Sequence, residues 1–543
     1  MKRLILAIHS LCFLLLVHAF AQPNWATDQL AIRDITKQLI TETQKWEQDA
    51  GGLYYYLNNW KWDDEVEIFY YWLPFYYLTG DQSAYETVKR AGLRYIERAE
   101  NAGKFYHGYY ENAYYDTEHT MEGLIILANL AYANPTDTEV IQALQDLAEH
   151  TGNWVSTCES WTNYETGFMR SLRPGTREVK TGNNTAIDWP FNLQFAKLAL
   201  AAYHTTGKQR YLDWVQQYLE AWTGLMKQNE TRNGFFVPPC SVDPYTGVAG
   251  PYSGLWWEAQ YEPGWSWKEN GFSSYRDFRV YIDCFVFTQD RTYLNALSRF
   301  LMTLFDNGDG YTPAHYFDGT TWTVRDNKWI AFMGAEISLL NNHENSDLEN
   351  AMSRWLKAMR YPYNSLRLWD YMTGGELQHI TYINEWSLNT TQQKLDQLKA
   401  LTALPPDPDD FPKYTSSSGC SMVPFGAITA PRGEMPHLQV MYFRNDRSLG
   451  LYKDVAALFK SRTETTRHFS LCNTGSSDRT IWVQADYLAK TITSVLVNNQ
   501  EKTVLDGNQA QIIIPANSTI DVQLNLDISD TIPPAVPKNV ALH

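Results

Sequence analysis

A tight turn between an apolar helix and an amphipathic helix recurs along this chain, and it constrains the fold more than any other feature. In two copies a glycine stops the first helix and a tyrosine follows soon after: Gly80 precedes Tyr85, and Gly207 precedes Tyr211. Two looser copies lie at Phe287–Asp290 and Tyr132–Asp137. Because such a stop followed at once by a helix cap is typical of a short helix-to-helix connection, the sequence predicts tandem αα-hairpins.

The two helices of each hairpin differ in character. The segments before the turns are apolar nearly all round: Ile68–Leu78, Leu124–Ala133, Phe191–Ala202, Val280–Phe287 and Ile330–Leu340. The segments after the turns, such as residues 87–94, are amphipathic. A helix that is apolar on every side is buried on every side. We therefore expect an inner ring of helices inside an outer one, with five or six hairpins.

Helical spacing of apolar residues covers most of residues 25–403. It predicts helices over Ala26–Gln48, Glu65–Leu78, Ala84–Glu100, Met121–Ala133, Glu139–Val155, Ile187–His204, Arg210–Met226, Tyr275–Phe287, Thr292–Phe305 and Asp347–Met359. Two long inserts, at about 156–186 and 228–273, interrupt the hairpins. In such a ring the long loops enter the inner helices at one end, and the tight turns lie at the other.

The composition changes near residue 404. A linker rich in Pro, Asp and Ser occupies 404–419, and residues 420–527 carry short alternating segments that predict a small antiparallel β-sandwich. The expected strands are Leu438–Phe443, His468–Cys472, Thr480–Ala485, Ser494–Val497 and Gln511–Ile514, with Asp506-Gly507 as a hairpin turn. Residues 528–543 are expected to be a tail. The predicted fold class is thus mainly α, a helical domain over 22–403 followed by the sandwich.

Residues 1–21 have the pattern of a secretory signal peptide. Lys2 and Arg3 precede an apolar run, and Ala19-Phe20-Ala21 fits a cleavage site. We therefore expect a secreted protein, periplasmic or extracellular, cleaved near Ala21, with no later segment apolar enough to span a membrane. Cleavage would leave five cysteines, and at this size we expect at most one or two disulfides.

Charge and aromatic content narrow the function classes. The formal net charge is −16, and loss of Lys2 and Arg3 makes it −18. An acidic chain lacks the basic surface that neutralises phosphates, so we expect no nucleic-acid partner. Aromatic residues make up 14% of the chain. Because sugar rings stack their C–H faces on aromatic planes, this excess suits a carbohydrate-binding cleft as well as a core.

Tandem αα-hairpins with Thr-Gly turns, an apolar and aromatic inner layer, an export signal and a C-terminal sandwich resemble the six-hairpin (α/α)-toroid superfamily. The resemblance covers roughly residues 25–525 and is architectural. It implies a toroid of about six hairpins with the small sandwich appended. It also implies a secreted glycoside hydrolase or polysaccharide lyase. Because no family-defining motif accompanies it, candidate site residues are taken from the starts of the inner helices and from the inserts.

Three acid-rich stretches supply the candidate catalytic residues: Asp63, Asp64 and Glu67; Glu118, His119 and Glu122; and Asp188. Glu67 falls on a helix that is expected to be buried, where an unpaired carboxylate is costly. Glu118 and Glu122 share a helix face, so one raises the pKa of the other, as a general acid requires. Helix capping equally explains the first stretch, and a bracing Glu–His pair equally explains the second.

Polar and aromatic groups near the same entries are the candidate substrate-binding residues: Trp60, Trp62, Tyr115, Asn183, Asn184, Trp189, Trp265, Tyr275, Arg276, Arg279 and His315. Arg276 and Arg279 would clamp an anionic substrate or would neutralise nearby acids. Residues 306–310 lack the ligand spacing of an EF-hand, so neither a metal nor a cofactor is expected.

Three functions follow from these residues. A glycoside hydrolase would use a carboxylate acid/base pair on a poly- or oligosaccharide. A polysaccharide lyase would pair Asn183, Asn184, Arg276 or Arg279 with a uronate and abstract a proton with His119, His315 or a Tyr. A non-catalytic glycan-binding protein is the third. The acidic charge favours a neutral substrate, and the oligomeric state stays open.

Overall fold

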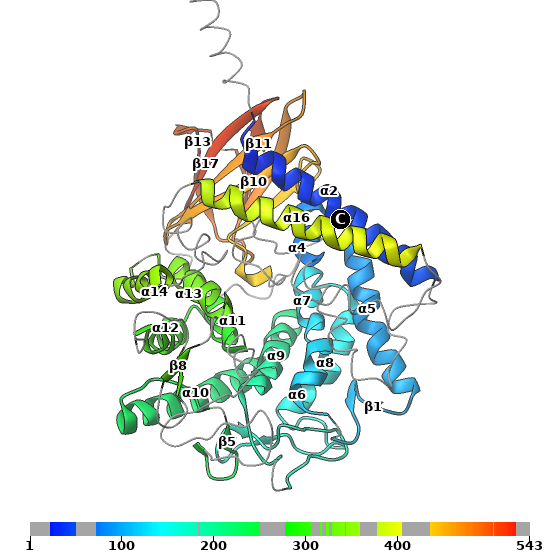
Figure 1. Ribbon diagram of the computed structural model, residues 1–543, viewed down its shortest axis with the longest axis vertical. Coiled ribbons are helices and arrows are strands. Elements are labelled where there is room, and N and C mark those ends of the chain that lie inside the picture. Colours follow the sequence, from blue (N-terminus) through cyan, green and yellow to red (C-terminus); the bar gives the residue numbers. More distant parts are fainter. Residues whose placement is uncertain are drawn as a thin grey trace, which may run out of the picture.

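The computed structural model describes residues 22–49, 72–113, 115–182, 185–239, 241–249, 277–306, 315–317, 322–324, 328–342, 344–358, 377–403, 435–502 and 504–527. Helices dominate the chain up to residue 402, and an antiparallel sandwich follows (Figure 1). None of the described helices is long and apolar enough to cross a membrane. Among the described cysteines, Cys158, Cys284 and Cys472 carry free thiols.

Most of the described helices begin and end close to where the sequence predicts them, but the helix Gln209–Asn233 ends seven residues later than predicted and the helix Leu377–Thr402 was not predicted. Their bounds are α2 Asn24–Asp49, α4 Trp72–Thr79, α5 Gln82–Asn101, α6 Thr117–Leu124, α7 Ile126–Ala133, α8 Thr138–Thr151, η1 Pro190–Asn192, α9 Leu193–Thr206, α10 Gln209–Asn233, α11 Val280–Thr288, α12 Arg291–Asp306, α13 Lys328–Leu340, α14 Ser346–Ala358, α16 Leu377–Thr402 and η4 Met435–His437.

Burial divides these helices into two layers. All eight residues of α7 are buried, as are seven of the eight in α4 and eight of the nine in α11. Their partners α5, α8 and α12 are amphipathic, with exposed residues along one side. In order along the chain, α4, α7, α9 and α11 each contact the next, and each packs on the helix that follows its turn. The predicted alternation of buried and half-exposed helices is confirmed for this part of the chain.

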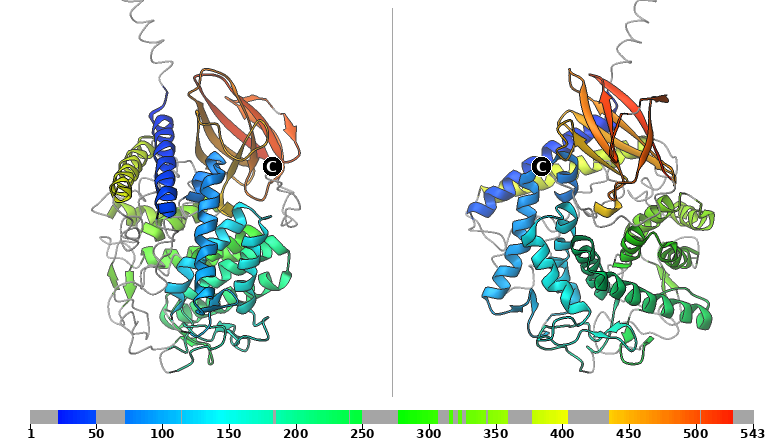
Figure 2. Two further views of the ribbon diagram at one scale, coloured as in Figure 1. Left: turned by 90° about the vertical axis from the view of Figure 1, so that its right-hand side faces the viewer. Right: turned by 180° about the vertical axis from the view of Figure 1, so that it is seen from behind.

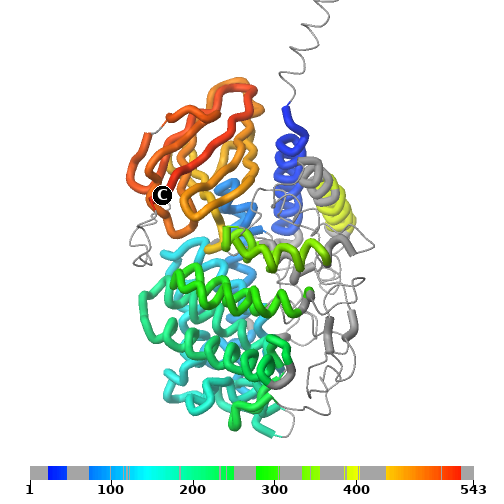
Figure 3. The backbone as a smooth tube through the Cα atoms, turned by 90° about the vertical axis from the view of Figure 1, so that its left-hand side faces the viewer, coloured from blue at the N-terminus to red at the C-terminus, as the bar shows by residue number. Residues whose placement is uncertain are grey.

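The helix pairs follow an arc below the sandwich (Figures 1 and 2). The arc runs from α4 and α5 through α7 to α10 and on to α11, α12, α13 and α14. The first and last described helices of this region, α2 and α16, pair with each other (Figure 3). The glycine turns have the expected left-handed geometry, with φ of +62° at Gly80 and +68° at Gly207, and Gln289 adopts φ +57° at the third turn.

Two predicted helices are corrected. The helix expected to start at Ile187 begins later: Trp189 is extended, with φ −145° and ψ 162°, and α9 starts only at Leu193 after the short η1. The cause is Pro190, which disfavours helical geometry at the residue before it. The helix expected over Met121–Ala133 is two helices, α6 and α7, separated at Ile125, where the Ala128 N–H bonds the Ile125 carbonyl at 3.1 Å in a 3₁₀ pattern.

The C-terminal region is two packed antiparallel sheets, one of order β10-β11-β17-β13-β14 and one of order β15-β16-β12-β9. The strand bounds are β9 Val440–Arg444, β10 Val455–Arg462, β11 Thr466–Asn473, β12 Arg479–Ala485, β13 Ile492–Val497, β14 Gln500–Glu501, β15 Leu505–Asp506, β16 Gln509–Ile514 and β17 Ser518–Leu526. Every predicted strand is present, and the hairpin at Asp506-Gly507 is confirmed by the pairing of Asp506 with Gln509. The linker 404–419 and the tail 528–543 lie outside the described residues.

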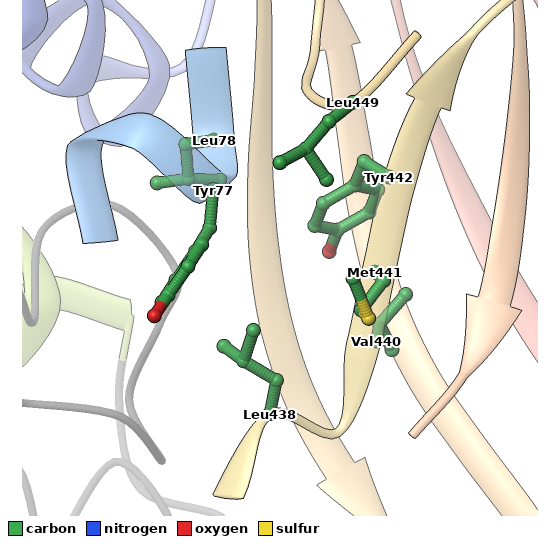
Figure 4. Close-up of a pocket in the computed structure, with 7 residues that line it drawn as sticks. All are labelled: Tyr77, Leu78, Leu438, Val440, Met441, Tyr442 and Leu449. Carbon is green, nitrogen blue, oxygen red and sulfur yellow. The ribbon is translucent and has the colours of Figure 1, made fainter. Parts of the chain in front are cut away.

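The sandwich docks on the end of the helical layer formed by the tight turns, which we call the turn end. The Leu451 N–H donates to the Leu78 carbonyl at 2.7 Å, and the Tyr487 hydroxyl donates to the Tyr132 carbonyl at 3.0 Å. Figure 4 shows Tyr77 and Leu78 of α4 facing side chains of the β9 region, including Leu449. The opposite end, where α6, η1 and α9 begin, is the loop end.

Candidate functional site

Many of the predicted site residues lie outside the described residues: Trp60, Trp62, Asp63, Asp64, Glu67, Asn183, Asn184, Trp265, Tyr275 and Arg276. For Glu118, His119 and Glu122 the structure describes the backbone, on the first two turns of α6, but not the side chains. The same holds for His315, on the short strand β7 (His315–Phe317). The described side chains among the predictions are Tyr115, Asp188, Trp189 and Arg279.

Asp188 is the centre of the loop end. Its side chain is fully buried, and its backbone forms an antiparallel bridge with Val242. One carboxylate oxygen accepts from the Met169 N–H at 2.8 Å. The other accepts from the Asn192 Nδ2 at 2.8 Å and from the Tyr218 hydroxyl at 3.0 Å. Three donors from three separate segments therefore converge on one carboxyl group.

Asn192 extends this network to α6. Its Oδ1 accepts from the Thr117 hydroxyl at 2.5 Å and from the Trp189 indole N–H at 3.2 Å. Its Nδ2 also donates to the Ser171 carbonyl at 3.1 Å. Thr117 is the first residue of α6 and directly precedes Glu118 and His119. The backbone at the start of α6 therefore lies beside the segment around Asp188.

Burial sets the protonation of Asp188. Removal from water raises the pKa of Asp188 to about 7, although hydrogen bonds from Met169, Asn192 and Tyr218 work in the opposite direction. A carboxyl group with this pKa has the right proton affinity for acid/base work near neutral pH. Because none of its side chain is exposed, however, it acts in this structure on the position of its neighbours and touches no surface open to substrate.

Two small β-hairpins, each with a four-residue loop, are attached to Asp188. One joins β3 (Thr162–Asn163) to β4 (Phe168–Met169), and the other joins β5 (Val242–Asp243) to β6 (Val248–Ala249). The carboxylate holds the end of β4, and the backbone bridge holds the start of β5. From the sequence, these segments are predicted only as inserts. The shared spacing of an Asn or Asp followed four residues later by a glycine was the signal that would have found them.

Of the predicted aromatic residues, Trp189 and Tyr115 have described side chains, and Trp189 belongs to the core. Trp189 is only 2% exposed, so in this structure its ring packs inside and presents no face to solvent. Tyr115 is half-buried, and its ring lies 5.0 Å from that of Tyr110. A tightly packed helical double layer needs large side chains at such positions, which explains the burial of Trp189.

Arg279 lies in a buried ion cluster that joins the helices to the start of the sandwich. Its Nη2 donates to Glu336 of α13 at 2.7 Å. His437 of η4 contacts Glu336 through Nδ1 and Asp283 of α11 through Nε2. Two roles were predicted for Arg279, clamping of an anionic substrate and neutralisation of nearby acids. In the structure it neutralises acids. His437, Asp283 and Glu336 were not predicted, because no local pattern links residues so far apart in the sequence.

His437 is doubly protonated in this cluster. Burial alone would lower the pKa of His437, but the charges of Glu336 and Asp283 outweigh burial and raise it to about 10. Since a carboxylate faces each ring nitrogen, both nitrogens donate. The Nη2 of Arg279, 3.1 Å from Nδ1, is then a second donor to Glu336 and not a donor to the ring. Two cations and two carboxylates therefore balance in a buried site.

No cluster of His, Cys, Asp and Glu suited to a metal ion occurs in the part of the chain that the structure describes. A family model described as a domain of unknown function (DUF8034) matches residues 153–347, about a third of the chain. The matched segment includes Asp188, both hairpins, Arg279 and Glu336. A search of curated proteins finds no match to the chain.

Proposed function

We propose that the protein is an exported glycoside hydrolase whose catalytic carboxylates lie at the loop end of the helical layer. The observation that carries the proposal is the buried chain from Asp188 through Asn192 to Thr117. It fixes the start of α6, whose first two turns carry Glu118 and Glu122, against the start of α9. Acid/base catalysis requires carboxyl groups held in one geometry by such surrounding hydrogen bonds.

The proposal includes an (α/α)-toroid fold for the helical region. The arc of helix pairs, with buried helices inside and amphipathic helices outside, supports it. So does the pairing of α2 with α16, because contact between the first and last helices is what closure of a ring requires. The sandwich covers the turn end only, which leaves the loop end for a substrate cleft.

The mechanism follows from two carboxyl groups on opposite sides of a glycosidic bond. One, as the acid, protonates the leaving oxygen, and the other activates water or attacks the sugar carbon. We assign these roles to a pair drawn from Glu118 and Glu122 of α6 and from Asp63, Asp64 and Glu67. A separation of ~6.5–9.5 Å would give inversion, and ~5–5.5 Å would give retention. Asp188 is then a positioning residue.

Lyase chemistry is the less supported alternative. A lyase needs a cation or amide to neutralise the uronate carboxyl, and Arg279 is already paired with Glu336 in a buried cluster. The net charge of −16 also disfavours a polyanionic substrate. Arg276, Asn183 and Asn184, the other candidates for this role, lie outside the described residues.

A panel of neutral and uronate-containing polysaccharides tests the proposal. New reducing ends without ultraviolet-absorbing unsaturated uronates would support a hydrolase, whereas unsaturated products would identify a lyase. Glu122→Gln and Asp64→Asn are each expected to lower kcat by about 100- to 10,000-fold. Glu139→Gln, at an exposed glutamate on α8, is the matched control. Full activity in both acid variants would refute the assignment of the pair, and no product from any polysaccharide would refute the enzyme.

Export is part of the proposal and has its own test. Expression of the full chain in a bacterial host with a general secretion system should give a mature protein that begins near Gln22, as read by mass spectrometry of its N-terminus. An N-terminus that retains Lys2 and Arg3 would contradict export.

A further inference from the structure

The two hairpins at the loop end have the same construction. In each, an Asn or Asp at the start of the loop accepts the N–H two residues on: Asn163 Oδ1 from Glu165 at 3.0 Å, and Asp243 Oδ1 from Tyr245 at 2.8 Å. In each, a glycine four residues later donates its N–H back to that Asn or Asp carbonyl, at 2.8 and 2.9 Å. Both glycines have positive φ, +82° and +66°, which favours glycine there.

The hairpins are locked to each other at their tips. The Asn163 Nδ2 and the Thr166 hydroxyl both donate to the carbonyl of Pro244, at 2.8 and 2.5 Å. Pro244 precedes Tyr245, and Asn163 precedes Tyr164. Their bases are held together through Asp188. The two tips, residues 163–167 and 243–247, therefore form one rigid surface, which we call the twin-hairpin surface.

Exposed aromatic side chains in the described residues gather on this surface. The large hydrophobic side chains that are exposed there are Tyr164 at 47%, Tyr245 at 47% and, next to them, Val248 at 54%. Elsewhere in the described residues the exposed large hydrophobic side chains, Val504, Leu505 and Ile513, are aliphatic and belong to the sandwich. In a chain with 35 Tyr, 23 Phe and 20 Trp, this concentration at two matched tips is not explained by core packing.

The geometry of Tyr164 suits stacking. Its hydroxyl donates to the Gly152 carbonyl at 2.8 Å, so the ring is fixed while about half of the residue stays exposed. A ring held in place loses little conformational entropy when a ligand binds. Glu165 and Thr246, beside the two tyrosines, are exposed and supply hydrogen-bonding groups.

We propose that the twin-hairpin surface binds pyranose rings of a polysaccharide chain, as an anchoring surface separate from the reaction site. Sugar rings offer apolar C–H faces to the tyrosines and hydroxyl groups to the polar neighbours. A protein partner fits less well, because a stable interface needs about 800 Å² on each side, and three apolar side chains flanked by polar ones cannot supply its core. The proposal rests on the proposed function only for its substrate class.

Affinity electrophoresis through gels that contain single polysaccharides tests this surface. The probes are mixed-linkage glucan, xylan, galactomannan, pullulan and polygalacturonate. At least one should retard the full chain, and the Tyr164→Ala/Tyr245→Ala double variant should bind it about 5- to 100-fold more weakly, because each lost ring contact is worth about two- to tenfold. Tyr164→Phe keeps the ring and should retain most of the binding. Ile513→Ala, which truncates an exposed apolar residue on the sandwich, should change nothing.

The outcomes separate this proposal from the proposed function. Hydrolysis of a short oligosaccharide by the double variant should match that of the unmodified protein, since the surface lies outside the reaction site. Its thermal midpoint should fall only by the loss of the Tyr164–Gly152 hydrogen bond. No retardation by any probe, or equal retardation of the double variant, overturns the surface. Tyrosine-dependent retardation without product from any polysaccharide supports the surface while refuting the enzyme.

Discussion

The turn end and the loop end of the helical layer are held by different kinds of interaction. At the turn end, short turns bring backbone against backbone: a Cβ built on Gly80 would lie 2.0 Å from the Leu449 carbonyl oxygen. At the loop end, the segments between the helices, which include the two small hairpins, are organised by one buried carboxyl group, Asp188, and its three donors. The first end is therefore rigid by close packing, whereas the second depends on a polar network that a change of charge can weaken.

The largest expected effect is on the ion cluster where the sandwich enters the helices. His437→Leu should lower the free energy of unfolding by about 3–5 kcal/mol at pH 7, because it leaves Asp283 and Glu336 buried with one cation between them. Denaturant midpoints measure the change. His468→Leu, at a half-buried histidine on β11, is the control. Equal midpoints for the two variants would contradict a stabilising role for the cluster.

The same cluster predicts the response to alkali. The pKa of His437 is raised to about 10 from its usual value near 6.5, so its stabilising contribution is complete below about pH 6.5 and is lost as the pH rises through 10. The midpoint of the unmodified protein should therefore fall between pH 8 and 10.5 more steeply than that of His437→Leu. Parallel curves would show that the imidazolium is not the group responsible.

A pair of glycine substitutions isolates the close approach at the turn end. Gly80→Ala should destabilise the protein by about 2–4 kcal/mol, because it combines a positive φ with a clash against backbone. Gly507→Ala has nearly the same φ, +59°, but no heavy atom within 4 Å of the new Cβ, so only the backbone strain of about 1–2 kcal/mol remains. Equal losses of unfolding free energy in the two variants, measured by chemical denaturation, would mean that the docked sandwich moves to accommodate the added methyl group.

At the loop end, Asp188→Asn should lower the free energy of unfolding by about 1–3 kcal/mol at pH 5. The reason is that the amide nitrogen of the new side chain would face one of the three hydrogen-bond donors that point at the carboxyl group. The pKa of Asp188 is raised to about 7, so the folded protein holds this proton more tightly than the unfolded chain. The stability that Asp188 contributes to the unmodified protein therefore falls as the pH rises from about 4 to 7. The difference between the two proteins should narrow over that range, and a widening difference would contradict the assigned pKa.

The smallest effect is expected at the surface of the insert. Lys180→Ala breaks an ion pair with Glu178 in which both side chains are nearly half exposed. Such pairs contribute at most about 0.5–1 kcal/mol, so the thermal midpoint should hardly move. A loss as large as that of Asp188→Asn would show that the loop end depends on surface charge and not on its buried network.

Prediction from sequence succeeds where the determinants are local. The layers, the glycine turns and the predicted strands follow from apolar spacing and from residues such as Gly80 and Gly207. It fails where partners are distant in the chain: Asp188 is fixed by Tyr218, thirty residues away, and Glu336 meets His437 across a hundred. Trp189 illustrates the same limit, because an aromatic residue at a helix entry has the same local pattern whether it is buried or exposed.

The pairing of α2 with α16 bears on the order in which the chain can acquire its structure. The first described helix, α2, packs on α16 and bonds β10 through Gln29 and Arg33. These partners are made roughly 330 to 430 residues later, which at about 5–20 residues per second is a delay of about 16–86 s. During that interval the side of α2 that packs on α16 and β10 has no native partner, although α5 can already bond Lys37 and Gln44. The contacts that join α2 to α16 and β10 are therefore among the last that the described residues can form.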